Sequence, residues 1–217
     1  MFSIATSLLW NRRNAIHFSR PVRATDQILS MAGNLLQDFL AAQQIEPVIP
    51  PPPTLQHWTK PDLHYHKVNF NAAVFREAHL AGIGVIVRDW RGEFVGALSS
   101  PMSLTHLVAE MEALACRKTI EFTAEIGVQR VIFEGDLTMV INALNQNNAG
   151  LSSYGVVIED IRIQALVFES CVFAHTSQVC NYVADAIAKK AKAFRSAQVW
   201  LNCPPDDIVS LLLFDVH

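Results

Sequence analysis

The chain has 217 residues, which is room for one ordinary domain with extensions and for a sizeable core. About half of its residues are apolar (51%), as in most globular proteins. The formal net charge of -3 argues against a broad electrostatic wrap around nucleic acid, although it leaves room for a local basic face. No apolar run approaches the roughly 20 residues that span a bilayer, so we expect no membrane association.

The amino-terminal residues 1–21 contain arginines and few acids, a composition compatible with a transit peptide. Their apolar run is interrupted by Trp10-Asn11-Arg12-Arg13, which argues against a secretory signal. The four cysteines form no CxxC motif and no zinc-like pairing with histidine. We therefore expect reduced thiols in an intracellular protein of the nucleus or cytoplasm, with organelle targeting left open.

The segment "TDQILSMAGNLLQDFLAAQQ", residues 25–44, places apolar side chains on one stripe at helical spacing. It predicts a helix within an amino-terminal helical extension that covers residues 1–46. The prolines that follow remove backbone donors and fix φ, so residues 47–60 are predicted to be an extended linker. A spacer is favoured over a ligand for SH3-type domains. The amphipathic helix is a possible docking site for a protein partner.

After the linker, short runs rich in β-branched and aromatic residues alternate with helical patterns. "RDWRGEF" has the composition of a hairpin turn. The predicted elements are strands at 66–75, 82–90 and 92–100, a helix at 107–127, a strand at 129–136, helices at 137–148 and 155–168, a strand at 170–177 and a helix at 181–194. This order predicts an α/β fold in which helices pack on a mixed sheet.

Three acids lie where these elements begin or end, or on an inward helix face. Glu112 is in the long helix beside Leu114 and Ala115, Asp136 ends the strand "VIFEGD", and Asp185 lies among apolar residues in "NYVADAIA". Each has an ordinary explanation: a solvated helix face for Glu112, a helix N-cap for Asp136, and an exposed first turn for Asp185. Together they suggest a ligand site, because carboxylates that converge need a cation between them. Oxygen ligands without cysteine or histidine favour Mg²⁺ or Mn²⁺.

The motifs "KVNFNAA", "AEMEALACR", "VIFEGD" and "FAHTSQVCNYVADAIAKKA" in this order resemble the type 1 ribonuclease H fold, and most closely its plant branch related to retroelement reverse transcriptases. The flanks "LLWNRRNAIHF", "HWTKPDLHYHKVNF" and "VWLNCPPDDIVSLLLFD" are also similar to that branch, so the resemblance covers nearly the whole chain. It implies a five-stranded mixed sheet with helices on both faces. The ribonuclease H-like domain is then expected at residues 61–197, with a carboxy-terminal tail at 198–217.

Position by position, the four metal-binding carboxylates of the family fall on Asn71, Glu112, Asp136 and Asp185. His175 matches a histidine frequent in this branch, and its alternative is a packed or hydrogen-bonded residue at a strand end. The chain departs from the family pattern because Asn71 replaces the first aspartate. Further departures are Ala72 and Leu137, and "HTSQVCN" lacks the customary proline, arginine and acid.

An amide oxygen ligates Mg²⁺ but brings no charge, whereas the family's first aspartate bridges two metal ions. The resemblance thus implies a metal-dependent endonuclease that cuts the RNA strand of RNA-DNA hybrids, weakened here by Asn71. The alternatives are an inactive module that binds hybrid or double-stranded RNA, or a retroelement-derived relic or scaffold. We expect a monomer.

Overall fold

The computed structural model describes residues 2–21, 24, 27, 32, 57–105, 107–146 and 154–215. Most of the helix predicted at 25–44, and the prolines of the predicted linker, lie outside the described residues. The contacts within the chain divide it into two units, 1–54 and 55–217. The first unit contains α1 (Phe2–His17), which lies in the predicted helical extension but for which the sequence analysis gave no separate bounds. This helix is followed by Ser19 at a left-handed φ of 51°.

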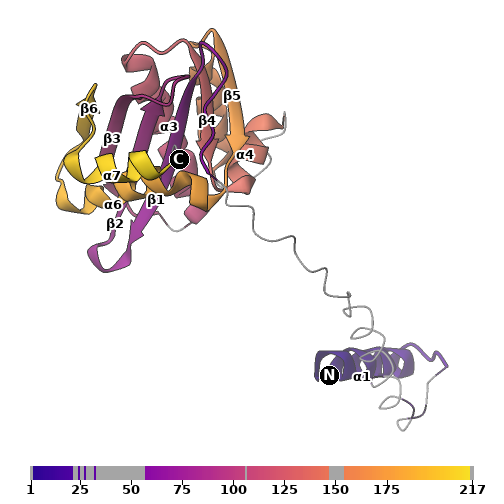
Figure 1. Ribbon diagram of the computed structural model, residues 1–217. Helices are drawn as coiled ribbons and strands as arrows, with labels where there is room; N and C mark the ends of the chain where they lie inside the picture. The colour runs from indigo at the N-terminus through magenta and orange to yellow at the C-terminus, as the bar shows by residue number, and fades with distance from the viewer. Residues whose placement is uncertain are drawn as a thin grey trace. The chain divides into compact units, whose positions relative to one another are not determined.

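The second unit alternates strands and helices as the sequence patterns predict (Figure 1). Its strands are β1 (His66–Phe75), β2 (Leu80–Arg88), β3 (Phe94–Ser103), β4 (Arg130–Gly135), β5 (Ser170–His175) and β6 (Gln198–Leu201). Its α-helices are α3 (Val108–Glu125), α4 (Thr138–Asn145), α5 (Gly155–Ala165), α6 (Tyr182–Lys190) and α7 (Asp206–Asp215). Short 3₁₀ turns are η1 (Arg76–Ala78), η2 (Gln178–Asn181) and η3 (Ala191–Ala193).

The strands form one mixed sheet in the order β5-β4-β1-β2-β3-β6. β1 is antiparallel to β2 and parallel to β4, which is itself parallel to β5. The sheet has six strands, so the expectation of five is wrong. The additional strand is β6, which pairs antiparallel with β3 and lies in the segment predicted as a tail. With only four residues, β6 is too short to give a periodic signal.

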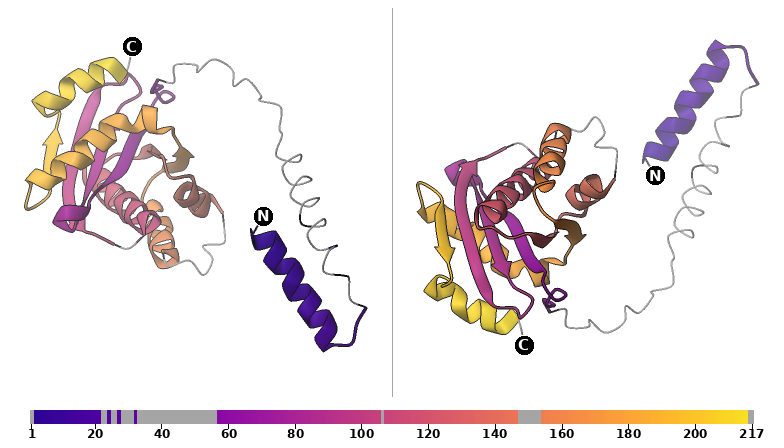
Figure 2. Two further views of the ribbon diagram at one scale, coloured as in Figure 1. Left: turned by 90° about the horizontal axis from the view of Figure 1, so that it is seen from below. Right: turned by 90° about the horizontal axis from the view of Figure 1, so that it is seen from above.

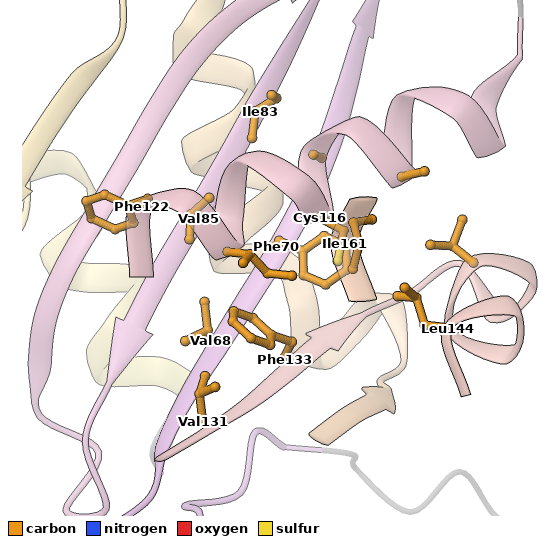
Figure 3. Close-up of a cluster of buried hydrophobic side chains, with 14 of the residues drawn as sticks. Val68, Phe70, Ile83, Val85, Cys116, Phe122, Val131, Phe133, Leu144 and Ile161 are labelled. Atoms are coloured by element: carbon orange, nitrogen blue, oxygen red, sulfur yellow. The ribbon is translucent and has the colours of Figure 1, made fainter. Parts of the chain in front are cut away.

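Helices cover both faces of the sheet, as expected (Figure 2). Alternate residues of β1 point to opposite faces, because side chains along a strand have a period of two. Phe70 packs toward α3 in the larger core, whereas Asn69 and Asn71 belong to the face that α6 covers. Figure 3 shows the larger core, in which side chains from β1, β2, β4, α3, α4 and α5 gather around Phe70 and Phe133. The smaller core joins α6 and α7 to the other face.

None of the helices in the described part of the chain has the length and apolar composition needed to cross a membrane.

Candidate active site

The candidate site lies where β1 extends past the end of its neighbour β4, so that one side of β1 is unpaired. β1 pairs with β4 only as far as Asn69 opposite Glu134, so the rest of β1 runs past the end of β4. Asn71 is buried there, with 6% of its surface exposed. The Ala72 N–H lies between two acceptors: it donates to Asn71 Oδ1 at 2.8 Å and to Glu112 Oε1 at 3.2 Å. The asparagine and the helix carboxylate therefore share one donor.

Glu112 reaches this edge from α3 and is buried, with 5% of its surface exposed, so the solvated-face interpretation does not hold. Its Oε2 atom is buried and has no hydrogen-bond partner among the described residues. The pKa of Glu112 is raised to about 8, chiefly by burial and then by the charge of Asp136, while the Ala72 N–H opposes the rise and the charge of Asp185 adds a smaller one. A cation bound beside Glu112 would therefore favour its ionised form.

Asp136 follows β4 immediately and is half-buried. Burial raises its pKa first of all, its own backbone hydrogen bond opposes this, and the charge of Asp185 adds to the rise. The N-cap position of α4 is occupied by Leu137, and no side chain caps this helix. Asp136 therefore does not act as the N-cap, which was the ordinary explanation for an acid at this position. His175 at the end of β5 is exposed, and its Nε2 donates to the backbone carbonyl of Asp136 at 3.2 Å.

Asp185 comes from α6, on the opposite face of the sheet from α3. The helix lies very close to β2, because a Cβ on Gly84 would stand 2.1 Å from the carbonyl oxygen of Ala184. Gly84 is also the register partner of Asn71 on β1. At the amino end of the helix, Asn181 Nδ2 donates to the Phe70 carbonyl at 2.9 Å. The close packing at Gly84 and the hydrogen bond of Asn181 together position Asp185 near the end of β1.

The structure thus brings Asn71, Glu112, Asp136 and Asp185 near one another, but their side chains are not arranged as a complete set of metal ligands. Among the described residues, no three histidine, cysteine, aspartate or glutamate side chains are arranged to hold a metal ion. Asp185 is instead paired with Lys189, one helical turn away, at 2.5 Å. The donor chemistry still suits a hard divalent cation, since all the groups are oxygens and Glu112 Oε2 is unpartnered.

A sequence-family model described as "Reverse transcriptase-like" matches residues 69–191, which is more than half of the chain. The chain belongs to this reverse transcriptase-like family. No curated protein sequence matches it. The matched segment contains all four candidate positions and His175.

Solved structures resemble the reverse transcriptase-like domain in fold. Ribonuclease H1 from the halophilic archaeon Halobacterium salinarum aligns with a TM-score of 0.50 and 19% identity, over 59% of this chain and 98% of that one. The amino-terminal ribonuclease H domain of a Mycobacterium tuberculosis protein gives 0.53 and 13%, over 59% and 94%. LC11 ribonuclease H1, isolated from compost and solved with an RNA/DNA hybrid, gives 0.53 and 18%, over 59% and 98%. The domain therefore has a ribonuclease H-type fold.

One polar cluster of the reverse transcriptase-like domain was missed by the sequence analysis. Arg88 is fully buried on β2, where its Nη1 donates to Asp215 at the end of α7 (2.5 Å) and its Nη2 donates to Asn69 (3.0 Å). Asn69 Oδ1 also accepts from the Trp58 indole N–H at 2.9 Å. The Arg88 guanidinium lies 3.6 Å from the centre of the Trp58 ring.

The same cluster continues to β4. Asn69 Nδ2 donates to Glu134 at 3.0 Å, and the other oxygen of Glu134 pairs with Lys67 at 2.8 Å. Two cations and two carboxylates thus balance within one buried network, as buried charges require. The sequence contains one sign of this network: Lys67, Asn69 and Asn71 are two residues apart along β1 and so lie on the same face of the strand.

Proposed function

We propose that this domain binds RNA-DNA hybrids and hydrolyses the RNA strand in a metal-dependent reaction that Asn71 weakens. The observation that carries the proposal is the convergence of Glu112, Asp136 and Asp185 from three elements, with Glu112 Oε2 buried and unpartnered. Such a group of mutually repelling carboxyls favours a divalent cation as its ligand. The ribonuclease H1 from compost, which shares the fold, was solved with an RNA/DNA hybrid.

The residues that would hold the cation are Glu112, Asp136 and Asp185, with the side-chain carbonyl of Asn71 as a neutral fourth donor. When bound, Mg²⁺ or Mn²⁺ activates water and stabilises the leaving oxygen of a phosphodiester. Glu112 must lose its proton to serve as a ligand, and its pKa of about 8 means that it keeps this proton at neutral pH without a cation. Ligand binding and proton release are therefore coupled at Glu112.

Two features of the chain weaken this arrangement. Asn71 brings no charge to a position where the family has an aspartate, and its Oδ1 already accepts from the Ala72 N–H. The Lys189 ammonium neutralises Asp185 and competes with a cation for its oxygens. Loss of a charged ligand costs several kcal/mol, which corresponds to several decades in rate.

The test is cleavage of a labelled RNA-DNA hybrid in Mg²⁺ or Mn²⁺ by the wild type, Asn71→Asp and Asp136→Asn. We expect weak wild-type cleavage that Asp136→Asn abolishes and Asn71→Asp increases by at least tenfold. Because Asp136 is half-buried and not a helix cap, its asparagine variant should remain folded, which circular dichroism verifies. Wild-type cleavage that survives Asp136→Asn would refute the assignment of the site.

The second candidate function is binding of hybrid or double-stranded RNA without cleavage. Asn71 and the Lys189–Asp185 pair favour it, since both lower the negative charge available to a metal ion. Salt-dependent binding of hybrid by the wild type, with cleavage appearing only in Asn71→Asp, would establish this alternative. Absence of hybrid binding even at low salt would leave a scaffold role.

A further inference from the structure

Two lysines follow Asp185 along one side of α6 and of the η3 turn after it. Asp185, Lys189 and Lys192 are spaced at i, i+4 and i+7, so they lie on one side of the helix and of the η3 turn that continues it. Lys189 is held by Asp185, whereas Lys192 is exposed and its ammonium lies 5.9 Å from the centre of the Phe75 ring. The row therefore ends beside the β1–β2 connection.

A surface cavity of about 350 Å³ lies at that connection. It is lined by Val74, Phe75, Arg76, Glu77, Ala78 and Lys192. Arg76 and Lys192 are exposed, and within the part of the chain that the structure describes neither forms an ion pair. Glu77 is the single acid among the lining residues, so the two cations outweigh it.

We propose that this cavity, walled by Phe75, Arg76 and Lys192, binds the phosphodiester backbone of a nucleic-acid strand that leaves the carboxylate site. The inference deepens the proposed function and rests on it. Two exposed cations that form no ion pair with any described residue are available to phosphate oxygens, and Lys192 lies beside the Phe75 ring, on which a base can stack. With a net charge of -3, the chain needs such a local basic surface to hold nucleic acid.

The distance fits a contact away from the cleaved bond. Asp185 and Lys192 are seven residues apart, which along a helix is about 10 Å. Successive nucleotides of one strand are roughly 3.4 Å apart along the duplex axis, so a separation of about 10 Å corresponds to at most about three nucleotides. A contact at this distance positions the strand without touching the reacting phosphate.

The experiment measures binding of a fluorescent RNA-DNA hybrid by anisotropy in EDTA, across a series of salt concentrations. The test variant combines Arg76→Gln and Lys192→Gln. The matched control is Lys190→Gln, which also removes one charge from the end of α6. In the wild type, however, the Lys190 ammonium is bound to both oxygens of Asp207, at 2.7 and 2.6 Å.

Each lost phosphate contact lowers the slope of log K against log salt by roughly 0.9 for a duplex. We therefore expect the slope of the double variant to fall by about 1.8 and that of the control to remain at the wild-type value. The single variants should each show about half of the loss. All the variants change exposed or surface-paired side chains, and equal melting temperatures verify that they are folded.

Wild-type binding with an unchanged slope in the double variant would overturn the inference and leave the proposed function standing. An equal loss of slope in Lys190→Gln would also overturn it, because the effect would then be general charge. If the wild type binds no hybrid at low salt, both the inference and the proposed function fail.

Discussion

Replacement of Glu112 by glutamine should stabilise the metal-free protein at alkaline pH. The pKa of Glu112 is raised from 4.5 to about 8, chiefly by burial and then by Asp136. Between these two values the folded state holds a proton that the unfolded chain has released. Stability of the wild type therefore falls as pH rises from about 4.5 to 8 and levels off above it.

The size of the effect follows from the shift. At 1.36 kcal/mol for each pKa unit, the ionised Glu112 costs the fold about 4 to 5 kcal/mol above pH 8. Glutamine keeps an oxygen that can accept from the Ala72 N–H but does not ionise. For a protein of this size, 1 kcal/mol is worth about 2–4 °C, so the variant should melt about 8–20 °C above the wild type at pH 9.

The assay is thermal unfolding of both proteins in EDTA from pH 5 to pH 9, with circular dichroism as the readout. The two melting temperatures should be similar at pH 5 and diverge toward pH 9. Added Mg²⁺ should then raise the melting temperature of the wild type at pH 9 and have a smaller effect on the variant. Parallel curves across the whole pH range in EDTA would refute the reasoning, because they would show that Glu112 ionises without cost.

Three further substitutions test the surroundings of the site. Gly84→Ala should destabilise the fold by about 2–4 kcal/mol in urea unfolding, because the added Cβ would stand 2.1 Å from the Ala184 carbonyl oxygen. A change below about 0.5 kcal/mol would mean that α6 does not pack this closely against β2. Asp215→Asn should cost about 3–5 kcal/mol in the same measurement by leaving the buried Arg88 charge without its partner, and a neutral result would show that the pair is solvated in solution. Asn71→Asp should lower the melting temperature in EDTA, since it adds a fourth acid beside mutually repelling carboxyls, and a rise would contradict this.

Periodic patterns predicted the elements of the sheet well where the residues are buried. β1 runs from His66 to Phe75, as predicted, because its alternation of apolar and polar side chains spans both faces of the sheet. β6 and α7 were missed for different reasons. β6 is four residues long, and α7 is apolar on several sides, with Leu213 and Phe214 exposed, so it gives a weak amphipathic signal.

The positions of the site followed from the family resemblance, whereas their environments needed the fold. The sequence pattern placed Glu112 on an inward helix face, with a solvated face as the alternative, and its contact with the Ala72 N–H shows that it faces the edge of β1. The pairing of Asp185 with Lys189 follows from helical spacing alone. By contrast, no local pattern shows that Asp136 and Asp185 are near enough to raise the pKa of Glu112.

The buried network explains how the fold can tolerate Asn71. Asn69 and Glu134 lie directly opposite each other in the parallel pair of β1 and β4, and each is two residues before a site position, Asn71 and Asp136. The hydrogen bond between Asn69 and Glu134 therefore fixes how far one strand extends past the other, whatever charge the site carries. Arg88 donates to the same Asn69 and is paired with Asp215 at the end of α7. The carboxy-terminal helix therefore also supports the register of β1 and β4. A change from aspartate to asparagine at position 71 thus alters the chemistry of the edge while the framework beneath it remains intact.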